Sequence, residues 1–389
     1  MSIFLDAASG KDTRRAPIWI MRQAGRYLPE YNALKERYGF WEMCRDPEVA
    51  AEITMLPLRR FSLDAAILFS DIMTPLADMG VEIEFAPGPV ITRPVRTLAD
   101  VRRLRVPGPG ETAPFVADAV RAVRERCHVP LIGFAGAPLT LATYLVDAGG
   151  AGDGHAGFRV WLHAQPEAAR LLLDRLTDVT IRYLRMQITA GAQAVQLFDS
   201  WAGSHEPAVY AEFGLPYTRR VLAALDDLAV PRIHFAVGAH HLLDRFAELP
   251  AEVVGVDWRT PLSAARRALP GRTLQGNLDP AVLVHRPAAL AGRARAVLRE
   301  GLGGPHIFNL GHGIRPDTPI GHVQRLIETV HGFDRHTEAG EDAEVGVRAE
   351  AGADGETAQR ADAGAYTDAG MDASAADGTA GDDGKGVPA

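Results

Sequence analysis

The 389-residue sequence is poor in cysteine and has no long apolar run. Its two cysteines, Cys44 and Cys127, have no metal-binding side chain at short spacing, so a disulfide framework is excluded and we expect inert thiols in a reducing cytoplasm. No apolar segment approaches the roughly 20 residues that a membrane-spanning helix needs. The amino terminus also lacks the basic start and apolar stretch of a secretory signal. We therefore expect no membrane partner.

Several motifs of common enzyme classes are missing as well. There is no P-loop, and no Gly-x-Gly-x-x-Gly run opens a helix after the first predicted strand. The glycine-rich turn at residues 133–136 contains no serine that could act as a nucleophile. These absences argue against nucleotide-dependent chemistry and against a serine hydrolase.

Acidic side chains are concentrated at the carboxyl terminus. Residues 337–389 carry 13 acidic and 3 basic side chains, a net charge of −10, whereas the whole chain carries −8, so that residues 1–336 carry +2. The segment is rich in Ala, Gly, Asp and Glu, and it cannot bury enough apolar surface to offset the entropy of ordering. We expect a disordered tail after a catalytic domain at 1–336. The slightly basic body permits an anionic ligand, and we expect no nucleic-acid partner.

Short apolar runs alternate with longer helical patterns through the body. Eight runs are typical of buried strands: 17–21, 65–69, 131–134, 194–198, 232–237, 253–257, 272–275 and 306–310. Helical patterns fall between them, several opening with Pro or with a capping residue: 47–61, 113–126, 166–190, 207–228, 262–269 and 288–300.

Eight strand–helix units predict a single (β/α)₈ barrel of the TIM type, because buried strands that alternate with helices form parallel sheets. A doubly wound open sheet is the alternative fold. Residues 81–92 interrupt the alternation, and their Pro-Gly-Pro turn predicts an inserted hairpin.

Polar side chains or small, glycine-containing turns follow five of the predicted strands. They occur at 22–26, 70–73, 135–138, 199–203 and 311–313. The carboxyl ends of barrel strands carry the chemistry in enzymes of this architecture, and small residues there let a ligand approach closely. The sequence therefore predicts an active site at this end of the barrel.

The loop after the first strand contains Arg22, Gln23, Ala24, Gly25 and Arg26. On spacing alone it is either a solvated loop with structural ion pairs or a carboxylate-binding loop. The second interpretation is favoured, since each guanidinium offers a planar fork that matches a carboxylate. Gln23 adds a neutral donor, and the amides near Ala24 and Gly25 could form an anion-binding concavity.

Asp71 closes an otherwise apolar stretch, where a carboxylate must be hydrogen-bonded or paired. It is either a helix cap or an acceptor for the N–H groups of a cationic intermediate. Tyr144 and Ser200 are either structural or substrate-orienting, and Asp199 competes with Ser200 as the important member of its pair. His312 lies between two glycines without a second ligand at metal spacing, so a hydrogen-bonding role is favoured over a metal site.

These segments resemble the uroporphyrinogen decarboxylase family over residues 16–330. The resemblance rests on residues 17–30 (PIWIMRQAGRYLPE), 69–76 (FSDIMTPL), 133–141 (GFAGAPLTL), 255–258 (GVDW), 275–280 (QGNLDP) and 309–313 (NLGHG). The first motif is highly specific. Lys35 departs from the family pattern, because some members place another arginine there.

The resemblance implies a barrel enzyme, usually a homodimer, that needs no metal or organic cofactor. It implies conversion of the four acetate side chains of uroporphyrinogen III to methyl groups, giving coproporphyrinogen III and CO₂ in haem biosynthesis. The implied substrate contacts are Arg22, Gln23, Ala24, Gly25, Arg26, Asp71, Tyr144, Ser200 and His312. Asp71, Arg22 and Arg26 are the implied catalytic residues.

A cofactor is dispensable because a ring-protonated pyrrole can itself accept the electrons that CO₂ leaves behind. Two alternatives stay open. A corrinoid-linked methyltransferase would share the barrel but needs a zinc site of His and Cys, and no cysteine lies near the candidate strand at 233–238. A non-catalytic tetrapyrrole-binding protein would bind the same ligand without releasing CO₂.

Overall fold

The computed structural model describes residues 2–85, 88–148 and 154–338. Within these ranges seven strands form one parallel sheet in sequence order. The strands are β1 (Ala66–Ile67), β4 (Leu131–Gly136), β5 (Ala194–Asp199), β6 (Arg232–Ala236), β7 (Val253–Gly255), β8 (Thr273–Leu278) and β9 (His306–Leu310). The sheet curls in the manner of a TIM-type barrel, which confirms the predicted fold class.

The predicted tail at 337–389 lies outside the described residues except for Thr337 and Glu338. Its disorder and its boundary with the barrel stay predictions.

The first predicted strand, at 17–21, differs from the other seven. It forms one isolated bridge, between Ile18 and Phe308 of β9. The Phe308 amide donates to the Pro17 carbonyl at 2.8 Å, and the Asp64 amide donates to the Ile18 carbonyl at 2.8 Å. The segment therefore lies between β9 and the residues that lead into β1. It takes the position of an eighth barrel strand without forming a regular strand.

Side chains replace the missing ladder bonds of this segment. Its amides donate to carboxylate and amide oxygens of other residues: Ile18 to Asp64, Ile20 to Gln23 and Met21 to Asn309. A run of β-branched residues predicts a strand, but it does not reveal that side-chain acceptors satisfy the backbone instead.

Asp64 is the main anchor of the closing segment. Its two carboxylate oxygens each accept from the Arg15 guanidinium at 2.7 Å, and one also accepts from the Ile18 amide at 2.8 Å. His331 lies 3.5 Å from the same carboxylate. Burial alone would raise the pKa of Asp64, but these donors together hold it at about 2.

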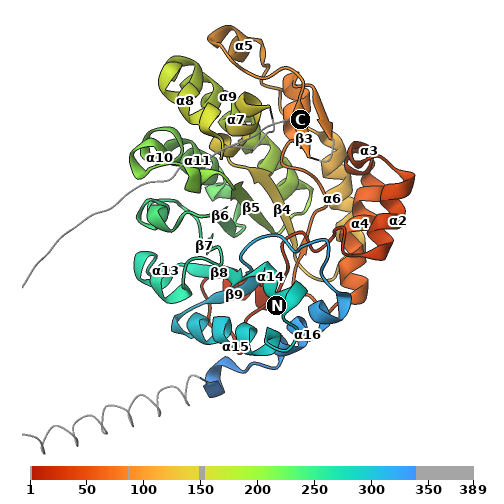
Figure 1. The fold of residues 1–389 in the computed structure, drawn as a ribbon. Coiled ribbons are helices and arrows are strands. Elements are labelled where there is room, and N and C mark those ends of the chain that lie inside the picture. Colours follow the sequence, from red (N-terminus) through yellow and green to blue (C-terminus); the bar gives the residue numbers. More distant parts are fainter. Residues whose placement is uncertain (1, 86–87, 149–153, 339–389) are drawn as a thin grey trace, which may run out of the picture. The chain divides into compact units, whose positions relative to one another are not determined.

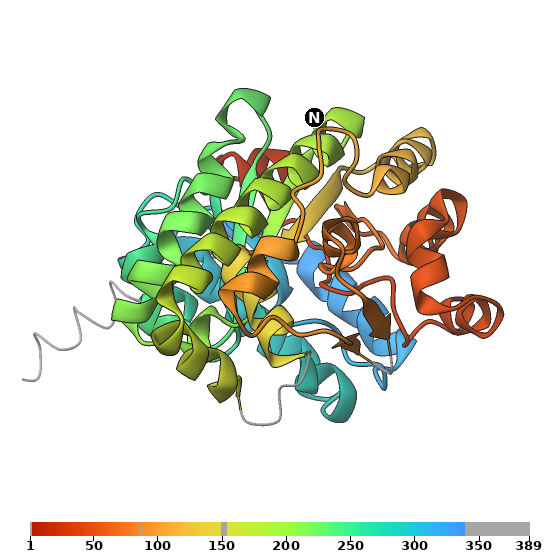
Figure 2. The ribbon, with the colours of Figure 1, turned by 90° about the horizontal axis from the view of Figure 1, so that it is seen from above.

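The predicted hairpin at 81–92 is confirmed. Strands β2 (Ile83–Phe85) and β3 (Pro89–Ile91) pair antiparallel and lie apart from the main sheet (Figure 2). Phe85 packs against Phe40 and Trp41, with ring centroids 4.7 and 5.4 Å apart. The hairpin thereby joins the helices that follow the arginine loop, and together they extend one wall of the barrel mouth.

Helices lie outside the sheet, as Figure 1 shows for α9, α11, α13 and α15. The longer ones are α4 (Pro47–Arg60), α6 (Pro114–Arg126), α7 (Pro138–Asp147), α9 (Pro166–Ala190), α11 (Leu215–Ala223), α15 (Leu290–Glu300) and α16 (Ile320–His331). The shorter ones are α1 (Ile3–Ala8), α2 (Pro29–Arg37), α3 (Phe40–Arg45), α5 (Leu98–Arg103), α8 (Ala156–Ala164), α10 (Pro207–Phe213), α12 (Leu243–Phe246), α13 (Leu262–Ala268) and α14 (Pro280–His285). Short 3₁₀ helices complete the set: η1 (Thr74–Met79), η2 (Ala202–Ser204), η3 (Asp226–Leu228), η4 (His240–Leu242) and η5 (Gly301–Gly303).

No helix in the described ranges is both long and apolar enough to cross a membrane.

The prediction of one continuous helix at 207–228 is wrong. The pattern at 207–228 is interrupted at Gly214, which separates α10 from α11, and the segment ends in η3. Pro216 stands in the first turn of α11, where its missing N–H is harmless, but a continuous helix would lose a hydrogen bond there. The Tyr210 ring occupies the space that a side chain at Gly214 would need.

The barrel interior contains a buried polar chain as well as apolar side chains. The Trp19 indole donates to Gln275 at 2.9 Å, and the Gln275 amide donates to Gln196 at 2.9 Å. All three side chains are buried. Their bonds tie the closing segment to β8 and β5 through the middle of the core, which favours one register of the segment over its neighbours.

We predict that Asp64→Asn destabilises the fold by about 2 kcal/mol at neutral pH, because the carboxylate charge that Arg15 and the Ile18 amide hold is lost. The pKa of Asp64 is lowered by folding, so its contribution is present above the unfolded-state pKa and disappears as the pH falls towards 2. Urea unfolding of both proteins from pH 7 down to pH 3 measures this. A stability difference that does not shrink below pH 4 would contradict the assignment.

Candidate active site

A cavity of about 580 Å³ opens at the carboxyl ends of the barrel strands. Residues after β1, β5 and β9 line it together with the arginine loop, α2 and the hairpin. Eight of the nine site residues predicted from the sequence lie in its wall: Arg22, Ala24, Gly25, Arg26, Asp71, Tyr144, Ser200 and His312. The fold thus brings together side chains that are nearly 300 positions apart in the sequence.

Gln23 is the ninth predicted residue, and it lies outside this lining. Its side chain is buried, where its oxygen accepts from the Ile20 amide at 3.1 Å and its nitrogen donates to the Ala65 carbonyl at 3.2 Å. Both polar groups of the side chain are therefore engaged with backbone. In this position Gln23 holds the arginine loop against the start of β1.

The arginine loop is tightly turned. Arg22 has a φ of +64°, a left-handed conformation that a residue with a side chain adopts at some cost in energy. Gly25 follows where a Cβ would lie 2.8 Å from the Arg22 carbonyl oxygen. The Arg22 side chain then lies along Gly313, where a Cβ would lie 2.9 Å from its Cγ. Glycine at both positions is thus a steric requirement for this path of Arg22.

Three cations line the cavity without an internal counter-ion. Arg22, Arg26 and Lys35 make no hydrogen bond or ion pair through their charged groups to any residue that the structure describes. Many arginines elsewhere in the described residues do pair with a carboxylate, as Arg15 does with Asp64 and Arg232 with Glu252. Three unpaired cations around one cavity favour a ligand that carries several negative charges.

Asp71 is the single acidic residue in the described cavity lining. One carboxylate oxygen accepts from the Met73 amide at 2.8 Å, which caps the turn before η1. The other oxygen has no hydrogen bond among the described residues, so the cap and a ligand contact are compatible. Burial raises the pKa of the Asp71 carboxyl, while the Met73 amide and Arg22 oppose that rise.

The sequence left open whether Ser200 or Asp199 is the important member of the pair. The structure places the two side chains in different surroundings. Asp199 is fully buried, where it accepts from Thr140 at 3.1 Å and from the Tyr210 hydroxyl at 3.0 Å. Ser200 lies in the cavity lining. The aspartate fixes the end of the strand, and the adjacent serine forms part of the cavity wall.

Tyr144 and His312 present neutral polar groups to the cavity. Burial raises the pKa of the Tyr144 hydroxyl, which therefore stays a hydrogen-bond donor at neutral pH. Burial lowers the pKa of His312 to about 4, with Arg22 acting in the same direction. The Gly313 amide donates to its Nδ1 at 2.7 Å, so the proton of the neutral ring is on Nε2. Both side chains are suited to donate to carboxylates.

Sequence reasoning missed the apolar part of the lining. Phe134, Phe198 and Phe235 lie near the ends of three adjacent strands, with ring centroids 5.6 and 6.0 Å apart along the series. Their shared position near the carboxyl ends of β4, β5 and β6 was a signal that the sequence offered. Aromatic faces opposite a cationic loop are suited to a ligand with a flat apolar body and a charged periphery.

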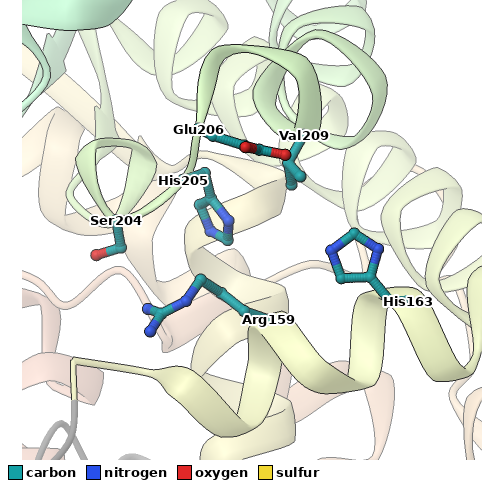
Figure 3. Close-up of a pocket in the computed structure, with 6 residues that line it drawn as sticks. All are labelled: Arg159, His163, Ser204, His205, Glu206 and Val209. Atoms are coloured by element: carbon teal, nitrogen blue, oxygen red, sulfur yellow. The ribbon is translucent and has the colours of Figure 1, made fainter.

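A smaller cavity of about 320 Å³ lies beside α8, and it contains no residue of the predicted site. Figure 3 shows the His163 and His205 rings on either side of this space, with the Arg159 side chain below the His205 ring. The lining is completed by Ser204, Glu206 and Val209. Burial lowers the pKa of His205 to about 4, so its ring is neutral.

The zinc site that a corrinoid-linked methyltransferase needs would lie on β6. His234 there is fully buried, 3.5 Å from Asp199 and against the Phe246 ring, and it does not line the main cavity. Across residues 2–85, 88–148 and 154–338, no group of three or more His, Cys, Asp or Glu side chains is arranged to hold a metal ion.

Comparison with known proteins gives a consistent family. Residues 1–333 match the family model described as uroporphyrinogen decarboxylase (URO-D). The chain is 47% identical over 332 residues to a uroporphyrinogen decarboxylase from Geobacter metallireducens, covering 84% of this chain and 97% of that protein. It is 50% identical over 338 residues to the protein of that name from Nocardia farcinica, covering 84% and 95%.

Among solved structures, a methyltransferase from Methanosarcina mazei is similar with a TM-score of 0.71 at 21% identity, covering 84% of this chain and 96% of that one. A B12-independent methionine synthase from Shewanella sp. is similar with a TM-score of 0.52 at 10% identity, covering 86% and 98%. At these identities the likeness concerns the fold alone.

We predict that Gly313→Ala weakens binding of a polycarboxylate about tenfold while changing the thermal midpoint little, because a methyl group there displaces the flexible Arg22 side chain rather than backbone. Calorimetric titration with benzenehexacarboxylate measures the affinity. Gly321→Ala is the matched control, since a Cβ there meets nothing within 4 Å. Equal affinities of the two variants would show that Arg22 does not depend on Gly313.

Proposed function

Because this chain belongs to the uroporphyrinogen decarboxylase family, we propose that its main cavity binds uroporphyrinogen III and releases CO₂ from the acetate side chains. The chain is a carboxy-lyase of porphyrin biosynthesis. The observation that carries the site assignment is the set of unpaired cations, Arg22, Arg26 and Lys35, around a cavity with an aromatic wall. A tetrapyrrole with carboxylates on its rim matches both features.

The chemistry needs an electron sink and a proton. When the bond between the acetate carboxylate and its methylene breaks, the electron pair must move into the pyrrole. Prior protonation of a ring carbon gives a cationic, iminium-like ring that accepts the pair as CO₂ leaves, so that a neutral exocyclic methylene forms. Protonation of that methylene carbon and loss of the proton from the ring carbon then restore the neutral pyrrole. The balance is one proton taken up for each carboxylate replaced by hydrogen. The substrate supplies the sink, so we propose that no cofactor takes part.

Asp71 is suited to stabilise the cationic ring. Its unpartnered carboxylate oxygen can accept the pyrrole N–H groups at the centre of the macrocycle, while the Met73 amide holds the other oxygen in place. A fixed carboxylate in a partly dehydrated cavity favours positive charge on the ring more strongly than water does. Asp71 therefore acts on the charge that develops during the reaction.

The cations act on the periphery. We assign Arg22, Arg26 and Lys35 to the acetate and propionate groups, with either arginine also able to relay the proton. Tyr144, Ser200 and His312 orient carboxylates through neutral hydrogen bonds. Lys35 provides a compact ammonium charge, whereas an arginine at this position could form two parallel hydrogen bonds to a carboxylate. The lysine therefore fixes the orientation of its carboxylate less strictly.

We further propose a homodimer in the cytoplasm. The dimer is supported by family resemblance. The location is supported by Cys44 and Cys127, which are buried free thiols and suit a reducing compartment.

The central test is an anaerobic assay with uroporphyrinogen III, in which products are separated by their number of carboxyl groups. The proposal expects CO₂ release and stepwise loss of the acetate carboxyls. Binding without CO₂ release would instead support the tetrapyrrole carrier.

In the same assay, we expect Arg22→Ala and Arg26→Ala each to raise KM by about 10- to 100-fold, which corresponds to the loss of a charge-assisted hydrogen bond. Unchanged KM and kcat in both variants would contradict the carboxylate clamp.

Asp71→Asn is expected to lower kcat by about 100-fold or more and to stabilise the folded protein at neutral pH. The pKa of Asp71 is raised by folding, so the carboxylate weakens the fold only above the unfolded-state pKa. The gain in unfolding free energy should therefore be absent near pH 4 and grow as the pH rises.

Asp64→Asn, whose carboxylate has a lowered pKa, is the control with the opposite sign. Near-native kcat in a folded Asp71→Asn variant would remove Asp71 from the central role.

A further inference from the structure

A buried acid–histidine pair lies behind the cavity wall and has no part in the mechanism above. The His155 Nδ1 is 3.0 Å from a carboxylate oxygen of Asp147, and the two side chains are 1% and 9% exposed. Asp147 ends α7, and His155 immediately precedes α8. Neither residue lines the main cavity. The contact thus joins the end of one helix to the beginning of the next.

The His155 ring is the base of an aromatic cluster. Its centroid lies 4.1 Å from the Trp201 ring at an interplanar angle of 63°. Tyr144 completes the triangle, with its ring 6.1 Å from His155 and 6.1 Å from Trp201, both edge-on. Of these three rings only Tyr144 lines the cavity. The other two support it from behind and leave its ring little freedom to turn.

The backbone at His155 indicates that the surroundings impose this arrangement. His155 has a φ of +63°, a conformation that usually belongs to Gly or Asn, and Gly154 before it has a φ of +66°. A strained residue persists when its neighbours over-determine its position. Here the neighbours are the Asp147 carboxylate and the Trp201 ring. Gly157 admits that carboxylate closely, since a Cβ there would lie 2.7 Å from the Asp147 oxygen.

Trp201 is itself tied to the strand that carries Ser200. Its amide donates to Thr140 at 3.3 Å, and Thr140 in turn donates to Asp199. The cluster therefore connects two walls of the cavity, the α7 wall through Tyr144 and the β5 wall through Ser200. A shift of the His155 ring would move both walls relative to each other.

We propose that Asp147 and His155 are positioning residues that fix the Tyr144 ring and the Trp201 indole, and thereby set the affinity of the cavity for one substrate carboxylate. The inference rests on the proposed function only in treating Tyr144 as a substrate contact. Neither residue touches the substrate. Their loss loosens the donor that Tyr144 presents, so it weakens binding more than it slows chemistry.

His155→Asn is the sharpest single variant. Asn tolerates the left-handed backbone and can still bond to Asp147, but it removes the ring that supports Trp201 and Tyr144. We expect KM to rise about tenfold and kcat to fall less than threefold, with a lower thermal midpoint because a buried ring is lost. His163→Asn is the matched control, because that ring is exposed on α8, the helix that His155 precedes, and lines the smaller cavity (Figure 3). It should leave KM unchanged.

A double-mutant cycle with Tyr144→Ala separates positioning from general structural damage. If His155 acts through Tyr144, the KM of the double variant equals that of Tyr144→Ala within about twofold. If the KM increases of the two single variants instead multiply in the double variant, the proposal is overturned. An unchanged KM in His155→Asn would also overturn it. If His155→Asn does not fold, Asp147→Asn replaces it in the double-mutant cycle. That variant keeps the His155 ring but weakens the hydrogen bond that orients it.

Binding of uroporphyrin, an oxidised and fluorescent analogue of uroporphyrinogen, gives a readout that does not depend on turnover. If the wild-type chain releases no CO₂ but the cycle holds for uroporphyrin affinity, the proposed function fails and the positioning role stands. If turnover is normal and His155→Asn leaves uroporphyrin affinity and KM unchanged, the proposed function stands and the positioning role fails.

Discussion

Asp64 accepts hydrogen bonds from the Arg15 guanidinium and the Ile18 amide, and its own amide donates to the Ile18 carbonyl. Within the described residues, these bonds close the barrel between β9 and β1, where no continuous strand ladder does so. Arg22 follows only four residues after Ile18, so the contact that closes the fold also fixes where the cationic loop begins. Because side chains satisfy the amides of residues 17–21, the chain can turn away from the sheet directly after them. A full strand ladder would keep the backbone extended for longer.

Charge is arranged differently on the surface and in the main cavity. Surface arginines are mostly paired with carboxylates, and exposed pairs of this kind contribute little to stability. In the cavity, Arg22, Arg26 and Lys35 are kept without such partners, although mutual repulsion of like charges disfavours that arrangement. Stability alone gives no reason for it. An anionic ligand does, because it supplies the missing partners upon binding.

The fold, and the place of eight of the nine predicted site residues in the cavity wall, could be predicted from the sequence, because they depend on local patterns. Apolar periodicity located the strands, and glycines beside polar residues marked their carboxyl ends. What the sequence did not reveal depends on tertiary partners. The segment at 17–21 has a strand pattern, yet Asp64, Gln23 and Asn309 satisfy its amides. The buried bonds of Gln23 give it a scaffold position that its place in the motif does not reveal. Similarly, no spacing rule links His155 to Trp201, because only the packing of α8 against the end of β5 brings the rings together.

The raised pKa of Asp71 is consistent with its proposed task. Burial outweighs the nearby positive charge of Arg22, so in the empty cavity ionisation of this carboxyl is disfavoured. A porphyrinogen brings N–H donors to the same oxygen, and donors favour the ionised form. Binding of the ring and ionisation of Asp71 are then linked, each favouring the other by the same free energy. A carboxylate already satisfied by an internal arginine, as Asp64 is, would gain little from the ligand. Among the described residues Asp71 makes no ion pair with the cations that line the same cavity, and its charge is therefore available to the reacting ring.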